Sequence, residues 1–94
     1  MIKTFADSET ARIFDGQRSK KFPVEIQKTV LRKLRNIESA ASAIDLRLPA
    51  GNRLEKLSGD RDGEYSIRVN DQWRICFEWI DGDAYNVELV DYHR

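Results

Sequence analysis

The chain has 94 residues, of which 40% are hydrophobic and 10% aromatic, enough for one small domain with a modest core. Its 16 Lys and Arg residues balance 16 Asp and Glu residues, and no apolar run is long enough for a membrane span or a secretory signal. We therefore expect a single domain over residues 1–94, in the cytoplasm and without a membrane partner. The lone cysteine, Cys76, excludes an intramolecular disulfide and is expected in the core or on a sheet face.

The N-terminal part of the chain predicts a short strand followed by a short helix. Residues 2–5 have the composition of a strand. Asp7 or Ser8 can then cap a helix that runs to about Phe14 and ends before Gly16.

A second helix is predicted to begin near Pro23, because proline suits the first turn of a helix. Its apolar residues are spaced by three and four positions, and Leu31 broadens the stripe; they are Ile26, Val30, Leu34, Ile37 and Ala41. Four basic residues fall mainly off this stripe: Lys28, Arg32, Lys33 and Arg35. Residues 45–52 contain a proline and a glycine and are expected to form a connection.

The remaining sequence has the alternating pattern of β-strands. Residues 53–57, 65–70, 73–80 and 84–92 are expected to be strands, with a hairpin turn at residues 81–83. Strands joined in this order form an antiparallel meander, which can pack one face on the helices. The predicted fold class is α+β, with two N-terminal helices packed on a small antiparallel β-sheet.

The hairpins also predict which side chains meet. A three-residue loop at 70–72 keeps the apolar residues of both strands on one face and places Arg68 directly opposite Arg74. A loop at 81–83 pairs Trp79 with Tyr85 and places Arg74 opposite Val90. Arg68, Arg74 and Tyr92 then lie on the sheet face away from the core.

Two arginines opposite each other need compensation, since like charges at this position are unfavourable. The neutralising groups could be acids, with Glu78, Glu88 and Glu55 as candidates. Alternatively, the pair binds an anion such as a phosphate, which suits the planar guanidinium group. The sequence leaves both possibilities open.

Charge is distributed unevenly along the chain. Residues 1–35 carry nine Lys/Arg and four Asp/Glu, a balance of +5, whereas residues 76–94 carry one and five, a balance of −4. The basic stretch Arg18–Phe22, together with the cations of the second helix, can either follow a phosphate backbone or form an ordinary solvated surface.

Several residues have plain structural interpretations. Trp73 and Trp79 share a face with apolar residues, so we expect them to pack on the core. Residues 60–62 lie between two glycines and are interpreted as turn residues. Taken alone, His93 near the end of the sequence would be interpreted as a solvated residue. Tyr92, taken alone, would be interpreted as a residue that packs on the sheet.

Residues 52–79, NRLEKLSGDRDGEYSIRVNDQWRICFEW, and residues 87–93, VELVDYH, resemble the HigB-type toxins of bacterial toxin–antitoxin pairs. These toxins are also called plasmid-maintenance killer proteins and belong to the RelE/ParE superfamily. The resemblance covers nearly the whole chain, including MIKTF at its start, and three motifs carry it: L-x-G-D-R, S-I-R-V-N-D-Q-W-R and D-Y-H.

This resemblance implies a RelE-like fold and a ribosome-dependent endonuclease that cuts mRNA in the ribosomal A site and so inhibits translation and growth. It implies a helix-turn-helix antitoxin of the HigA type, which neutralises the toxin and binds operator DNA. The functional positions of the family fall here on Arg68, Arg74, Asp91, Tyr92 and His93.

The sequence departs from the family pattern at two positions. Glu55 stands where some relatives carry a histidine, and Ser58 stands where many carry a lysine. Lys56 lies nearby and is a candidate RNA-binding residue, as are Lys20 and Lys21 of the basic stretch for the ribosome.

The chain has one histidine, one cysteine and no spacing typical of metal ligands, so we predict acid–base chemistry that needs no metal or cofactor. In this hypothesis Arg68 and Arg74 bind the scissile phosphate and His93 transfers a proton. Asp91 orients His93 or polarises the 2′-hydroxyl, and Tyr92 donates a proton or stacks on a base.

Two other functions stay open at this point. The first is non-enzymatic inhibition of a partner protein such as gyrase, as in ParE-type relatives. The second is a weakly active toxin domain that acts mainly through antitoxin binding and operon autoregulation; Glu55 and Ser58 keep this possibility open.

Overall fold

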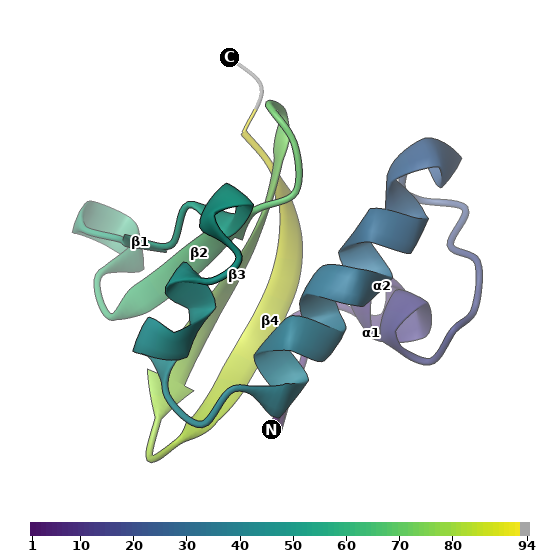
Figure 1. The fold of residues 1–94 in the computed structure, drawn as a ribbon. Helices are drawn as coiled ribbons and strands as arrows, with labels where there is room; N and C mark the ends of the chain where they lie inside the picture. The colour runs from purple at the N-terminus through teal and green to yellow at the C-terminus, as the bar shows by residue number, and fades with distance from the viewer. Residues whose placement is uncertain (93–94) are drawn as a thin grey trace.

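Two helices form close to where the sequence predicts them, in a computed structural model that describes residues 1–92 (Figure 1). Helix α1 spans Ser8–Phe14, and the Asp7 side chain caps it by accepting a hydrogen bond of 2.7 Å from the Thr10 N–H. Helix α2 spans Val24–Ser39. It ends before Ala41, the last residue of the predicted apolar stripe.

The buried face of α2 contains two polar residues in addition to the predicted apolar stripe, and Lys33 is one of them, with 7% of its surface exposed. Its ammonium group donates to the side-chain oxygen of Asn52, which is itself fully buried. Burial lowers the pKa of Lys33, and the nearby charges of Arg32 and Arg68 lower it further. The prediction that Lys33 is a surface cation with its basic neighbours is therefore wrong.

The segment after α2 contains two 3-10 helices, Ala43–Arg47 and Ala50–Asn52, where the sequence predicts only a connection. Asn52 fixes the end of this segment through its side-chain amide, which donates to the carbonyl groups of Leu46 and Leu48 at 3.2 Å each. These bonds satisfy the polar groups of a segment that passes close to the core.

Four antiparallel strands form one sheet in the order β1-β2-β3-β4. Their bounds are Glu55–Lys56 for β1, Glu64–Arg68 for β2, Trp73–Ile80 for β3 and Asp83–Asp91 for β4. The N-terminal segment lies parallel to β4 through bridges from Ile2 to Ala84 and from Phe5 to Val87, so the predicted first strand adds to this edge only in part. The α+β prediction is confirmed.

The register between β2 and β3 agrees with the prediction, because Ile67 pairs with Ile75 and Arg68 with Arg74. Between β3 and β4, the predicted pairing of Trp79 with Tyr85 is wrong. The hairpin turns through two residues, so Trp79 pairs with Ala84.

A β-bulge corrects the register further along the same pair of strands. Cys76 pairs with Glu88 and Glu78 pairs with Tyr85, so β4 contains one more residue than β3 between these pairs. Asn86 lies in this interval with a φ of 53°, a left-handed conformation that asparagine tolerates better than most residues. Beyond the bulge, Arg74 pairs with Val90 as predicted.

The core lies between one face of the sheet and helices α1 and α2, which Figure 1 shows together on one side of the sheet. Its buried members come from both helices and from β2, β3 and β4, with Val30, Leu34, Ile67, Ile75 and Phe77 at 0% exposure. Trp73 and Trp79 are partly buried and pack against this core, as predicted.

Candidate functional site

Arg68 of β2 and Arg74 of β3 lie directly opposite each other. They alternate along their strands with Ile67 and Ile75, which are buried in the core, so the arginines belong to the opposite face of the sheet. Each arginine has its own partner, and these partners compensate the unfavourable pairing of like charges.

Arg74 is held in one orientation and is only 8% exposed. Its Nε donates to the Ser66 hydroxyl at 2.8 Å, and its Nη2 donates to the Arg53 carbonyl at 2.6 Å and to the Ser66 carbonyl at 3.3 Å. Its Nη1 lies 3.6 Å from a carboxylate oxygen of Glu55. The site therefore contains a preorganised positive charge that needs little rearrangement to meet an anion.

Arg68 is more accessible and forms an ion pair with Asp71 in the loop between β2 and β3. The prediction of the neutralising acids is thus only partly correct. Glu55 faces Arg74 as predicted, whereas Asp71, which was not a candidate, neutralises Arg68. The Asp71 side chain is fully exposed, so this ion pair is screened by solvent and can exchange for another anion at small cost.

Tyr92 lies beside Arg74, as the register predicts. The guanidinium carbon of Arg74 is 6.0 Å from the centre of the Tyr92 ring, and the phenol oxygen is 3.6 Å from the thiol of Cys76. Burial raises the pKa of Tyr92 to about 12, and the hydrogen bond with Cys76 contributes to this shift. Burial likewise raises the pKa of Cys76, so both groups stay protonated at neutral pH.

Asp91 is the last residue of β4, and its carboxylate accepts a hydrogen bond of 3.2 Å from the side-chain amide of Gln72. The Tyr92 N–H donates to the backbone carbonyl of Gln72. His93 lies outside the described residues, so its place in the site stays a prediction.

An open hollow of about 490 Å3 adjoins Tyr92. Besides Tyr92 it is lined by residues of β1 and of the loop that follows: Glu55, Lys56, Leu57, Ser58, Asp60 and Arg61. The predicted RNA-binding residue Lys56 thus lines the same hollow as Tyr92. Ser58 also lines it.

Arg61 is a residue of this hollow whose role the sequence did not reveal. Its guanidinium donates to Glu64 at 2.9 Å and to Glu88 of β4 at 2.6 Å, and the bond to Glu88 raises the pKa of Arg61. It lies in the short 3-10 helix Gly59–Arg61, so the prediction of a turn is correct. The two ion pairs attach this turn to the sheet, and the second of them joins residues 27 positions apart.

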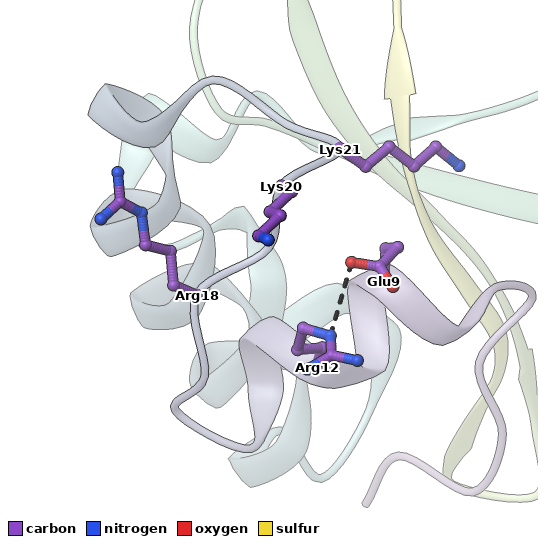
Figure 2. A pocket seen from close by; sticks show the side chains of 5 residues that line it. All are labelled: Glu9, Arg12, Arg18, Lys20 and Lys21. Carbon is purple, nitrogen blue, oxygen red and sulfur yellow. Dashed lines mark ion pairs between the residues drawn. The ribbon is translucent and has the colours of Figure 1, made fainter.

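A second hollow, of about 580 Å3, contains the other two predicted RNA-binding residues, Lys20 and Lys21. Figure 2 shows them with Arg18 along the loop that faces Glu9 and Arg12 of α1. Glu9 is 3.5 Å from Arg12 and accepts from the Ser19 hydroxyl at 2.8 Å. Four cations and one carboxylate give this hollow a positive balance; the contribution of Arg12 was not predicted.

The loop that carries these cations is fixed by Gln27, a buried residue of α2. Its side-chain oxygen accepts from the Ser19 N–H at 2.9 Å, and its amide donates to the carbonyls of Ser19 and Phe22 at 2.7 and 2.8 Å. Three buried hydrogen bonds hold the backbone on both sides of Lys20 and Lys21, so these side chains extend from a rigid base.

Residues 1–92 contain neither a candidate metal site nor a candidate membrane-spanning helix. No group of three or more His, Cys, Asp or Glu side chains among these residues is arranged to hold a metal ion. Within the same range, neither helix has the length and apolar character needed to cross a membrane.

Comparison with solved structures defines the class of fold. The YoeB–YefM complex from Staphylococcus aureus contains a chain that superposes with a TM-score of 0.63 at 19% identity, covering 100% of this chain and 99% of that one. YafQ from E. coli superposes with a TM-score of 0.54 at 13% identity, covering 97% and 93% of the two chains. The fold is therefore the one shared by these solved structures.

Sequence comparison then identifies the family. Residues 3–93 match the model of the HigB-like toxins, described as RelE-like toxins of type II toxin–antitoxin systems. Toxin HigB-1 of Vibrio cholerae is 44% identical over 85% of this chain and 83% of its own length, and Endoribonuclease HigB of Proteus vulgaris is 33% identical over 99% and 100%. The chain belongs to the HigB-like toxin family, which confirms the resemblance.

Proposed function

We propose that this HigB-like toxin is an endoribonuclease that cleaves mRNA in the ribosomal A site and so inhibits translation and growth. The observation that carries the proposal is the pairing of Arg74 with Tyr92: a fixed guanidinium lies beside a phenol that keeps its proton, at the edge of an open hollow. This combination supplies charge stabilisation and proton transfer, the two needs of phosphodiester cleavage. The name of the Proteus vulgaris relative, an endoribonuclease, supports the same activity.

In the proposed reaction the 2′-hydroxyl of one nucleotide attacks the adjacent phosphorus. His93 takes the proton of that hydroxyl, while Asp91 orients the His93 side chain. The bond from phosphorus to the 5′-oxygen then breaks. Tyr92 gives its proton to the departing 5′-oxygen, which leaves a 2′,3′-cyclic phosphate and a free 5′-hydroxyl. Arg68 and Arg74 hold the negative charge that develops on the phosphate.

Tyr92 is better suited to the acid than to the base in this scheme. A phenol with a pKa of about 12 is almost entirely protonated at neutral pH, so it has a proton to donate and does not readily accept one. The assignment of His93 as the base follows from this, because an imidazole titrates near neutral pH.

The proposed partners are the ribosome with its mRNA and a HigA-type antitoxin, which would carry the complex to operator DNA. YoeB of Staphylococcus aureus has been solved with YefM as a toxin–antitoxin complex, which supports an antitoxin partner for a chain of this fold. Lys20 and Lys21 are proposed to contact ribosomal RNA and Lys56 to contact the mRNA near the reacting phosphate.

Glu55 favours the alternative of a weakly active toxin. Its carboxylate lies 3.6 Å from Arg74 and lines the hollow next to Ser58, so it competes with a phosphate for the arginine. The cost to phosphate binding is modest, however, because the Glu55 side chain is 57% exposed and solvent screens its charge.

Primer extension on mRNA in a translating extract tests the proposed function. We expect the wild-type chain to cut within codons only when ribosomes are present, and His93→Ala to lower the rate by about 100- to 10,000-fold. Arg68→Ala should also lower cleavage without unfolding the chain, because its partner Asp71 is left fully exposed to solvent. Arg47→Ala removes an arginine from an exposed position and is the control, which should cleave as the wild type does.

Intact mRNA in extracts whose translation has stopped would contradict the nuclease. Intact mRNA together with inhibited DNA supercoiling would instead support a ParE-like inhibitor. If mRNA, translation and supercoiling are all unaffected while the antitoxin still binds, the chain acts through complex formation alone.

A further inference from the structure

We infer that Gln72 is a positioning residue that holds the end of β4, and with it Asp91 and Tyr92, in the geometry needed for cleavage. The inference rests on the proposed function in that Asp91 and Tyr92 act on RNA. Gln72 belongs to the loop between β2 and β3, which Figure 1 shows next to the end of β4. It is part of neither the predicted catalytic set nor the predicted RNA-binding set.

Gln72 contacts this segment through both its backbone and its side chain. Its carbonyl accepts from the N–H of Tyr92, and its side-chain amide donates to Oδ2 of Asp91 at 3.2 Å. Trp73 and Asp91 form the last pair of the β3–β4 register, so Gln72 continues the contact one residue beyond the ladder. Two consecutive residues of the site are thereby attached to a single loop residue.

The loop can serve as a support because its own conformation is fixed. The side-chain oxygen of Asn70 accepts from the N–H groups of Gln72 and Trp73 at 2.8 Å each. The N–H groups of Val69 and Asn70 both donate to the Trp73 carbonyl, at 2.9 and 3.2 Å. These bonds close the loop independently of β4, so it does not need the last strand in order to keep its shape.

The side-chain amide of Gln72 supplies a hydrogen-bond donor to the carboxylate of Asp91. The Tyr92 ring is already placed by Arg74 and Cys76, but neither contact fixes the carboxylate of Asp91. A neutral amide can donate to a carboxylate without carrying a positive charge. A lysine or arginine at the same position would also attract the phosphate. In the proposed site, this hydrogen bond from Gln72 orients the carboxylate of Asp91 beside the proton-transfer group.

The loop also connects the two halves of the site. Asp71, the neighbour of Gln72, forms the ion pair with Arg68. A phosphate-binding arginine and the segment that transfers protons are thus attached to adjacent residues of one loop. A displacement of this loop would move both, and displacements of about 1 Å can cost 100-fold in rate.

Two substitutions at Gln72 separate positioning from simple packing. Gln72→Glu preserves the shape of the side chain but replaces the donor with a carboxylate facing Asp91, whereas Gln72→Ala removes the side chain. We expect both to lower the single-turnover cleavage rate on programmed ribosomes by about 10-fold or more, with the ribosome affinity unchanged. Gln72→Glu should be at least as severe as Gln72→Ala, because it adds repulsion to the loss of the hydrogen bond.

Asn86→Asp is the matched control. Asn86 donates its side-chain amide to Glu78 at 3.1 Å, so this substitution also turns an amide–carboxylate bond between strands into a like-charge pair. Asn86 lies in the same sheet, at the β-bulge of β4. The Asn86→Asp variant should therefore cleave mRNA as the wild type does.

Hydrogen exchange gives a readout that does not depend on catalysis. The amide of Tyr92 should exchange several-fold faster in Gln72→Ala than in the wild type, because the segment loses one of its two attachments to the loop. Unchanged exchange at Tyr92, or full cleavage activity in Gln72→Glu, would overturn the inference. So would a loss confined to ribosome affinity, since it would make Gln72 an RNA-contacting residue.

The same experiment distinguishes failure of the proposed function. If the wild type cleaves no mRNA while exchange at Tyr92 rises in Gln72→Ala, the attachment of the segment stands and the nuclease proposal falls. If the wild type cleaves and neither variant differs from it, the nuclease stands and Gln72 has no positioning role.

Discussion

The phenol of Tyr92 lies in surroundings that keep it neutral. It is partly buried, and its hydroxyl contacts the buried thiol of Cys76, so ionisation would place a negative charge where solvent is limited. Arg74 favours the ionised form, but burial has the larger effect and the pKa rises. The phenol of Tyr92 is therefore protonated at neutral pH.

Tyr92→Phe should therefore keep the ring against Arg74 but lower mRNA cleavage by about 100-fold, the range typical for loss of a general acid. Absorbance at the tyrosinate band gives a second measurement. The difference between wild type and Tyr92→Phe should titrate near pH 12, because that is the pKa of the folded-state phenol.

The same pKa shift makes the folded chain less stable at high pH. The folded pKa lies above the ordinary value of about 10, so the stabilisation from the neutral phenol is fully present below pH 10 and is lost as the pH rises towards 12. A titration midpoint at or below pH 10 would contradict the described surroundings of Tyr92.

The sequence predicted part of this site for a clear physical reason. Alternation along two strands and the length of one loop suffice to place Arg68 opposite Arg74 and Tyr92 near them. The contact of Arg61 with Glu88 and that of Arg74 with the Arg53 carbonyl could not be predicted, because they depend on the path of irregular segments. Glu88 is 27 residues from Arg61, and the Arg53 carbonyl is 21 residues from Arg74.

At the level of secondary structure, the pairing of β3 with β4 contains two irregularities that compensate each other. The hairpin turns through Asp81 and Gly82, both with positive φ, rather than through three residues. This shifts the register by one residue, and the bulge near Asn86 shifts it back before the site is reached. The sequence Asp81-Gly82-Asp83 fits either loop length, so the sequence alone could not choose between them.

Asn86→Val tests the role of the bulge. A β-branched residue is strained at a φ of 53°, so we expect a loss of about 1–2 kcal/mol in the free energy of unfolding, measured by denaturant titration. Asn86→Gly keeps the conformation accessible and should cost less. Equal stability of the Val and Gly variants would show that the left-handed conformation does not matter for folding.

At the level of the whole molecule, the basic N-terminal part of the chain forms a defined surface. The hollow with Arg12, Arg18, Lys20 and Lys21 is built from α1 and a loop held by Gln27. The uneven charge of the sequence predicted a basic region. It did not predict that Lys33 is buried, because this burial depends on a hydrogen bond to Asn52, which is 19 residues away in the sequence.

Lys20→Ala combined with Lys21→Ala should weaken ribosome association and reduce its dependence on salt, because fewer counterions are released from RNA on binding. Sedimentation with ribosomes over a series of KCl concentrations measures this. Lys3→Ala combined with Arg47→Ala removes the same charge from exposed positions elsewhere and should leave the salt dependence unchanged. An identical salt dependence for the wild type and the Lys20/Lys21 variant would contradict RNA binding by this hollow.

The N-terminal segment against β4 has a consequence for the order of events during synthesis. Its bridges join Ile2 to Ala84 and Phe5 to Val87, and the Thr4 hydroxyl accepts from the N–H of Asn86 at a separation of 82 residues. These contacts cannot form until β4, the last of the four strands, has been made, and contacts of such long range close slowly. A nascent chain therefore has neither a covered sheet edge nor Tyr92 beside Arg74 until nearly all of the fold has been synthesised.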